Sequence, residues 1–77
     1  MKAVPLRSRE LAEEDYSDFE LEVQGLGAVL TAAVQTYTTP HGTKHARLTD
    51  PVVSFDETRT NAEELGELVR AYGFEAR

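Results

Sequence analysis

The pattern of apolar and polar positions divides the chain into a β-rich middle and a helical end. Residues 19–24, FELEVQ, alternate strictly, and this period of two predicts a half-buried strand. The apolar set that would face the core is Phe19, Leu21 and Val23. Residues 28–38, AVLTAAVQTYT, are rich in β-branched and aromatic types and predict a second, longer strand.

A turn and a third strand follow the long strand. Residues 40–43, PHGT, have the proline and glycine chemistry of a turn, and residues 44–49 return as a strand. Asp50 and Pro51 interrupt the ladder, because proline has no N–H group to donate. Residues 52–55 either continue the third strand past a kink or begin a fourth.

The C-terminal segment predicts a helix over residues 60–73. A capping box fits in either of two frames, Thr60 with Glu63 or Asn61 with Glu64. The apolar stripe at helical spacing is Ala62, Leu65, Leu68, Val69 and Tyr72. Gly73 follows as a helix-ending residue, which lets Phe74 fold back onto Val69 in a Schellman-type contact.

Residues 1–17 commit least to one structure. They predict either an extended N-terminal arm or a short helix capped by Ser8. The whole chain, residues 1–77, therefore predicts one α+β domain. It would hold an antiparallel meander of three to four strands over residues 18–56, with the C-terminal helix packed on one face and the arm beside it.

Charge is distributed unevenly along the 77 residues. The net charge of −6 arises from 14 Asp and Glu against 8 Lys and Arg. Residues 10–22 contain acids and no base, whereas residues 23–49 contain no acid. A net-acidic chain repels polyphosphate, which argues against a nucleic-acid binder. The chain has no cysteine and no apolar run long enough for a signal peptide or membrane span, so we expect a cytoplasmic protein without a membrane partner.

The hairpin around residues 36–47 holds both histidines and no acid. With a loop over residues 40–43, one polar face would carry Thr36, Thr38, His45 and Arg47. This tip is either a site for a phosphate or carboxylate or, as we favour, a solvated turn, since no glycine-rich cradle or helix N-terminus adjoins it. The candidate anion-binding residues are His41, Lys44, His45 and Arg47.

Two histidines are too few for a closed zinc site, and no positioned nucleophile or second acid–base group accompanies them. A chain of this length also rarely encloses a substrate pocket. We therefore expect no enzyme activity, no metal and no cofactor.

The long predicted strand carries apolar residues on both of its faces. One helix covers one face of a small sheet, so the other must meet the arm through Leu6 and Leu11, a second copy of the chain, or another protein. The acidic run is either a solvated surface or one that engages a basic partner or mimics nucleic acid. The candidate interface residues from these two features are Leu30, Ala32, Val34, Asp18, Glu20 and Glu22.

These patterns favour a small non-enzymatic interaction protein that binds another macromolecule, through a sheet face or the acidic surface. The partner would be another protein, or a second copy in a homodimer. Small acidic proteins of this kind are common among regulators, inhibitors and particle components, including phage-encoded ones, which is an association with a class. The alternative is a binder of a small anionic ligand or nucleotide that uses the basic hairpin tip.

Overall fold

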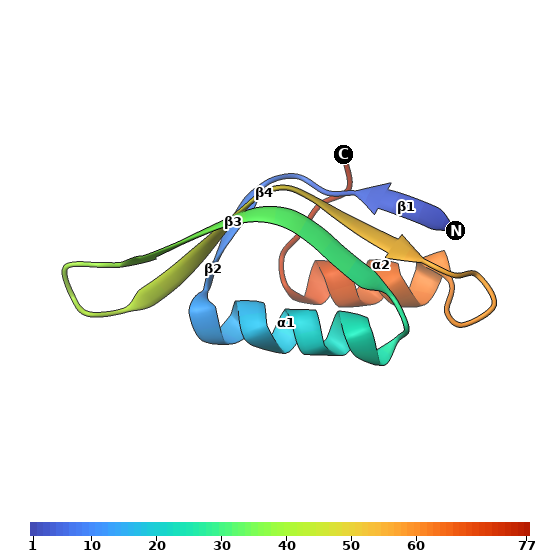
Figure 1. Cartoon of the computed structure of the whole chain (residues 1–77), viewed down its shortest axis with the longest axis horizontal. Helices are drawn as coiled ribbons and strands as arrows, with labels where there is room; N and C mark the ends of the chain where they lie inside the picture. The colour runs from blue at the N-terminus through green and yellow to red at the C-terminus, as the bar shows by residue number, and fades with distance from the viewer.

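In the computed structural model, which describes all residues from 1 to 77, two helices lie on the same face of one antiparallel sheet (Figure 1). The strands are β1 (Lys2–Pro5), β2 (Arg9–Ala12), β3 (Val29–Thr38) and β4 (Lys44–Phe55). The helices are α1 (Glu13–Gly25) and α2 (Ala62–Ala71). The α+β class, the antiparallel sheet and the C-terminal helix are confirmed.

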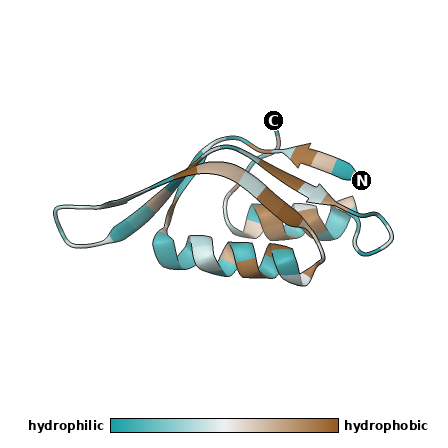
Figure 2. Ribbon diagram, viewed as in Figure 1, coloured by the Kyte–Doolittle hydropathy of each residue, from teal (hydrophilic) through white to brown (hydrophobic).

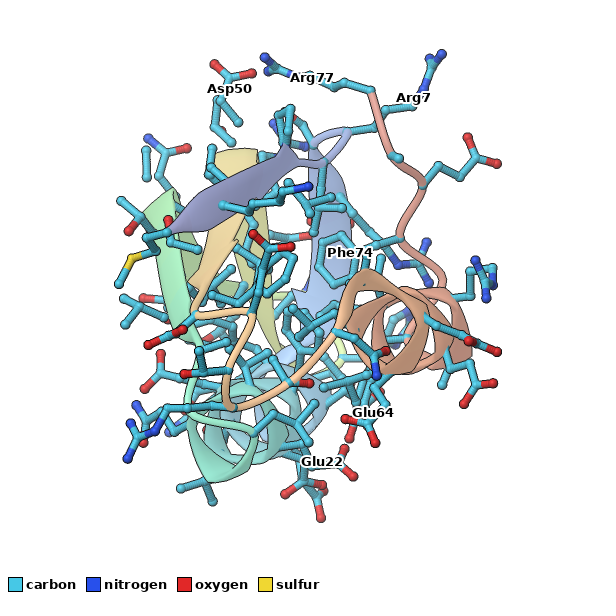
Figure 3. The ribbon with its side chains drawn as sticks, turned by 90° about the vertical axis from the view of Figure 1, so that its right-hand side faces the viewer. Arg7, Glu22, Asp50, Glu64, Phe74 and Arg77 are labelled. Atoms are coloured by element: carbon cyan, nitrogen blue, oxygen red, sulfur yellow. The ribbon has the colours of Figure 1, made fainter.

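β4 is the central strand, and every other strand pairs with it. β3 runs along its whole length on one side. On the other side, β1 pairs with the C-terminal half of β4 and β2 with the N-terminal half, so together they form one interrupted edge strand. The sheet therefore has two edges, and β3, drawn in green, forms the outer margin of the sheet in Figure 3.

The kink predicted in the third strand is a β-bulge within β4. The pairing with β3 shifts between Thr31 and Ala33, where Asp50 and Pro51 of β4 supply one residue more than β3 does. Asp50 adopts a positive φ of 49° and donates its N–H to Ser8 Oγ at 3.0 Å. Pro51, which has no N–H, thus lies where the ladder is already interrupted. The third strand continues past its kink, as one of the two alternatives predicted.

Residues 13–25 form a helix, so the strand predicted over residues 19–24 is wrong. Phe19 and Val23 are buried four residues apart, a spacing that fits a helix as well as a strand. Leu21, the third member of the alternating set, is 65% exposed and points away from the core. Three acids occupy the first turn of α1, where they interact favourably with the helix dipole.

The N-terminal segment is part of the sheet rather than an arm beside it. Its two strands pair with β4, and Leu6 and Leu11 enter the core between the sheet and the helices. They therefore leave the opposite face of the sheet uncovered. α1 connects β2 to β3, which lie on opposite sides of β4, whereas the predicted meander implied that successive strands would be neighbours.

The C-terminal helix is α2, and its two ends form as the sequence predicts. The Asn61 side chain accepts a hydrogen bond from the Glu64 N–H at 2.9 Å, which selects one of the two capping frames. Gly73 takes a φ of 80°, and the Phe74 N–H donates to the Val69 carbonyl at 3.0 Å in a Schellman arrangement. Phe74 is thereby held between α2 and the sheet (Figure 3), where its ring stacks on Phe19 of α1.

Candidate functional site

β3 is an edge strand over all of its ten residues. One side of its backbone pairs with β4, and no backbone hydrogen bond joins the other side to any part of the chain. An unpaired row of N–H and C=O groups is a template for another strand. At about 3.3 Å per residue, this template is about 33 Å long.

The directions of the β3 backbone groups follow from the closure of the hairpin. The Thr39 N–H donates to the Thr43 carbonyl at 2.8 Å. In an antiparallel pair, alternate residues direct both backbone groups to the same side. Gln35 therefore directs its groups toward β4, whereas Val34 and Thr36 direct theirs outward.

β3 lacks the features that usually prevent edge strands from pairing. Natural edges are protected by charged side chains, proline, bulges or a covering segment. The sequence of β3, VLTAAVQTYT, contains no charge and no proline, and the bulge of the sheet belongs to β4. The outer backbone groups of β3 are thus unpaired, and no charge, proline or bulge on the strand hinders pairing with another strand.

Exposed apolar side chains gather on the same strand. Val29 is 55% exposed, Tyr37 43% and Val34 37%, and these are three of the five large apolar side chains that the chain leaves exposed. Figure 2 shows β3 as a largely apolar ribbon where it crosses above the helices. Strand addition at this edge would remove part of this apolar surface from water.

A sheet face that neither helix covers adjoins this edge. Paired residues of adjacent strands share a face, so the side opposite the buried Leu48 and Val53 is the uncovered one. Over the body of the molecule it is formed by small and β-branched side chains without charge. From β3 and β4 these are Val29, Thr31, Ala33, Thr49, Val52 and Ser54.

The three apolar residues predicted for an interface lie on the other face, toward the helices. Leu30 and Ala32 are half-buried and pack against the core. Val34 lies opposite Leu48, at the margin of the helix layer. The uncovered face therefore carries the other alternating set of β3, to which Val29 belongs.

The acids predicted for an interface lie on α1, where they occupy two different stripes of the helix. Glu20 accepts a hydrogen bond from the Tyr16 hydroxyl at 2.8 Å. Asp18 and Glu22, four residues apart, share a different stripe that faces α2. The Tyr72 hydroxyl donates to the Glu22 carboxylate, and this hydrogen bond is the largest of the effects that raise the pKa of Tyr72 to about 12.

The hairpin register differs from the prediction because the loop is longer. It spans residues 39–43, so Thr36 lies opposite Ala46 and Thr38 opposite Lys44. Relative to the predicted pairing, the register is shifted by one residue. Side chains of the two strands that were predicted to share a face of the hairpin therefore lie on opposite faces. The polar face predicted from Thr36, Thr38, His45 and Arg47 is therefore wrong.

The four candidate anion-binding residues do not converge. His45 and Arg47 share the uncovered face, Lys44 lies on the opposite face, and His41 is in the loop. Acids also oppose the cations. Lys44 lines a hollow together with the acids Glu13 and Glu14 of α1. Arg47 lies opposite Glu10 of β2, whose carboxylate accepts a hydrogen bond from the Tyr37 hydroxyl.

The other edge of the sheet is covered, at the break between β1 and β2, by the C-terminal tail, residues 75–77. At the break between β1 and β2, the Arg7 N–H donates to the Glu75 carbonyl at 2.8 Å, and the Arg77 N–H donates to the Pro5 carbonyl at 3.1 Å. Arg77 also forms an ion pair with Asp50, and the two lie together at the top of Figure 3. The sequence did not predict this contact, since an alanine between two charged residues carries no strand pattern.

The described residues include no group of three or more His, Asp or Glu side chains placed to hold a metal ion. Neither α1 nor α2 is both long and apolar enough to cross a bilayer.

No protein-family model matches the chain, and neither the curated proteins nor the solved structures contain a significant match to it.

Proposed function

We propose that this protein is a non-enzymatic interaction protein that binds a protein partner through the free edge of β3 and the uncovered face beside it. One observation carries the proposal: β3 is a ten-residue edge strand with no charge, no proline and no covering segment. In strand addition, main-chain hydrogen bonds supply affinity and alternate side chains supply specificity.

The side chains along the β3 edge indicate which side chains a partner strand would carry. An added strand would place every second side chain beside Val29, Thr31 and Ala33 on the uncovered face, where all neighbours are small or apolar. β-branched and aromatic side chains fit such positions, whereas a charged side chain would gain no partner there. We further propose a cytoplasmic setting as a regulator, an inhibitor or a particle component.

A proline substitution tests this use of the edge. Thr36→Pro removes an N–H that points outward, so the ladder between β3 and β4 keeps its hydrogen bonds. Thr36→Ala is the matched control, since it alters the same side chain and retains the N–H. Each variant and the wild type would be immobilised and used to capture proteins from a lysate of the native host, with identification by mass spectrometry.

We expect at least one protein to be retained by the wild type and by Thr36→Ala but lost with Thr36→Pro. Circular dichroism of each variant establishes that the fold is kept. Retention of every captured protein by a folded Thr36→Pro variant would contradict the proposal, because binding would then not use the outer backbone of β3.

A further inference from the structure

We infer that the strand which adds to β3 is β3 of a second copy, so that two chains form one continuous sheet about a two-fold axis. This inference rests on the proposed function, because it names the occupant of the same edge. The observations behind it are the side-chain pattern along β3, the absence of charge on it, and the direction of its backbone groups.

Symmetry restricts the possible registers. A two-fold axis perpendicular to the sheet relates two antiparallel strands without exchanging the two faces of the sheet. Residues that lie opposite each other across the axis must therefore come from the same face of β3. The axis must then pass through a residue paired with its own copy. Placing the axis at Ala33 sets Val29 opposite Tyr37 of the second copy, and this pair occurs twice.

This register places opposite each other the two most exposed large apolar side chains of β3; in the single chain the Tyr37 ring stacks on His45 of β4, so it must turn outward to reach Val29 of the second copy. Val29 and Tyr37 belong to the same face of the strand, 55% and 43% exposed. A β-branched residue beside an aromatic one is a favourable cross-strand pair. The backbone groups of Val29 and Tyr37 point toward β4 of their own chain. Across the two-fold axis the two residues would therefore form a non-hydrogen-bonded pair, the type in which side chains lie closest.

The hydrogen bonds of the same register come from the other alternating set. Val34 would lie opposite Ala32 of the second copy, and Thr36 opposite Leu30, with all four directing their N–H and C=O groups outward. Each such pair exchanges two hydrogen bonds. Every residue of β3 between positions 29 and 37 thus finds a partner of matching face and matching backbone direction.

Charge does not oppose the pairing along the strands themselves. Two chains of net charge −6 repel each other, yet β3 is uncharged, so no like charges meet along the paired strands. The acids of α1, the helix that packs against β3, would repel those of the second copy, and salt screens this repulsion. Self-association through β3 should therefore strengthen as salt is raised, whereas binding of a basic partner to the acidic residues of α1 would weaken.

Sedimentation equilibrium of the full chain between about 1 μM and 1 mM tests the inference, with three substitutions. Ala33→Lys and Ala33→Glu each place two like charges face to face at the two-fold axis. Thr49→Lys is the matched control, because Thr49 pairs with Ala33 on the same face but belongs to the central strand. We expect the wild type to reach twice its mass of 8.6 kDa.

Each Ala33 variant should raise the dissociation constant of the dimer about tenfold, and Thr49→Lys should change it less than about threefold. An equimolar mixture of Ala33→Lys and Ala33→Glu should restore association, which a misfolded variant could not do. Equal weakening by Ala33→Lys and Thr49→Lys would overturn the inference in favour of packing through the uncovered face. A mixture that stays monomeric would overturn it as well.

The proposed function can survive the failure of this inference. A wild type that stays monomeric to 1 mM excludes the second copy, yet a captured protein that depends on the Thr36 N–H would still support binding at β3. Failure of both experiments would remove the edge as a binding site altogether.

Discussion

The β1–β2 edge and the β3 edge border the same central strand, yet they are built in opposite ways. The first carries the charged residues Lys2, Arg7 and Arg9, is broken between its two strands, and is covered at the break by the C-terminal tail. β3 is continuous, uncharged and bare. The chain thus protects one edge with several devices and leaves the other without any, and the proposed binding at β3 rests on this difference.

The two edges also differ in what lies behind them. Leu6, at the break of the β1–β2 edge, is fully buried in the core, and its backbone forms a bridge with Ala76 of the tail. Val29, at the start of β3, is more than half exposed. The closed edge therefore contributes to folding, whereas the apolar side chains of the open edge remain free to contribute to binding.

The largest effect should come from the core of the closed edge. Leu6→Ala should lower the free energy of unfolding by about 2–5 kcal/mol, because a buried leucine is replaced and a cavity remains. Val29→Ala is the matched control on the open edge and should cost less than about 0.5 kcal/mol in the monomer. Urea denaturation at a dilute concentration measures both. Equal losses would mean that the edges do not differ in this way.

Removing the tail should have an intermediate effect. Deletion of residues 75–77 takes away the two main-chain hydrogen bonds at the break and the bridge between Ala76 and Leu6, so we expect a loss of about 1–3 kcal/mol. Amide hydrogen exchange supplies a local readout, in which the Arg7 N–H should lose its protection while the amides of β3 keep theirs. Unchanged stability and a protected Arg7 amide would show that the tail does not close this edge.

The smallest effect should come from the ion pair of the tail. Arg77→Gln removes the pairing with Asp50, and both side chains are substantially exposed. Exposed ion pairs contribute between about 0 and 1 kcal/mol, so the loss should be well below that of the tail deletion. Thermal denaturation of the two variants in low and high salt compares them. A loss as large as that of the deletion would assign the closure to charge rather than to main-chain pairing.

Local signals in the sequence predicted α2 and the kink of β4. The Asn61 cap, the Gly73 terminus and the lack of an N–H at Pro51 act within a few residues, so they can be recognised without the rest of the fold. The strand at residues 29–38 was predicted for the same reason, from its run of β-branched and aromatic types.

The features that define the two edges are non-local and could not be predicted in this way. Which strand is the edge depends on β1, β2 and β3 all pairing with β4, which no short segment encodes. α1 was missed because Phe19 and Val23 satisfy both periods, and the exposed Leu21 alone distinguishes them. The composition of each hairpin face was predicted wrongly because one extra loop residue shifts the register by one, which changes the side chains that share a face.

An isotope-filtered NOE experiment on a mixture of labelled and unlabelled chains tests the central claim most directly. Along one β3 strand, Val29 and Tyr37 lie about 26 Å apart, too far for an NOE, so a signal between the Val29 methyl groups and the Tyr37 ring can arise only between two copies. We predict this signal at millimolar concentration, together with slower exchange of the Val34 and Thr36 amides. Self-association without this signal, and with unchanged exchange of those two amides, would contradict pairing at the β3 edge.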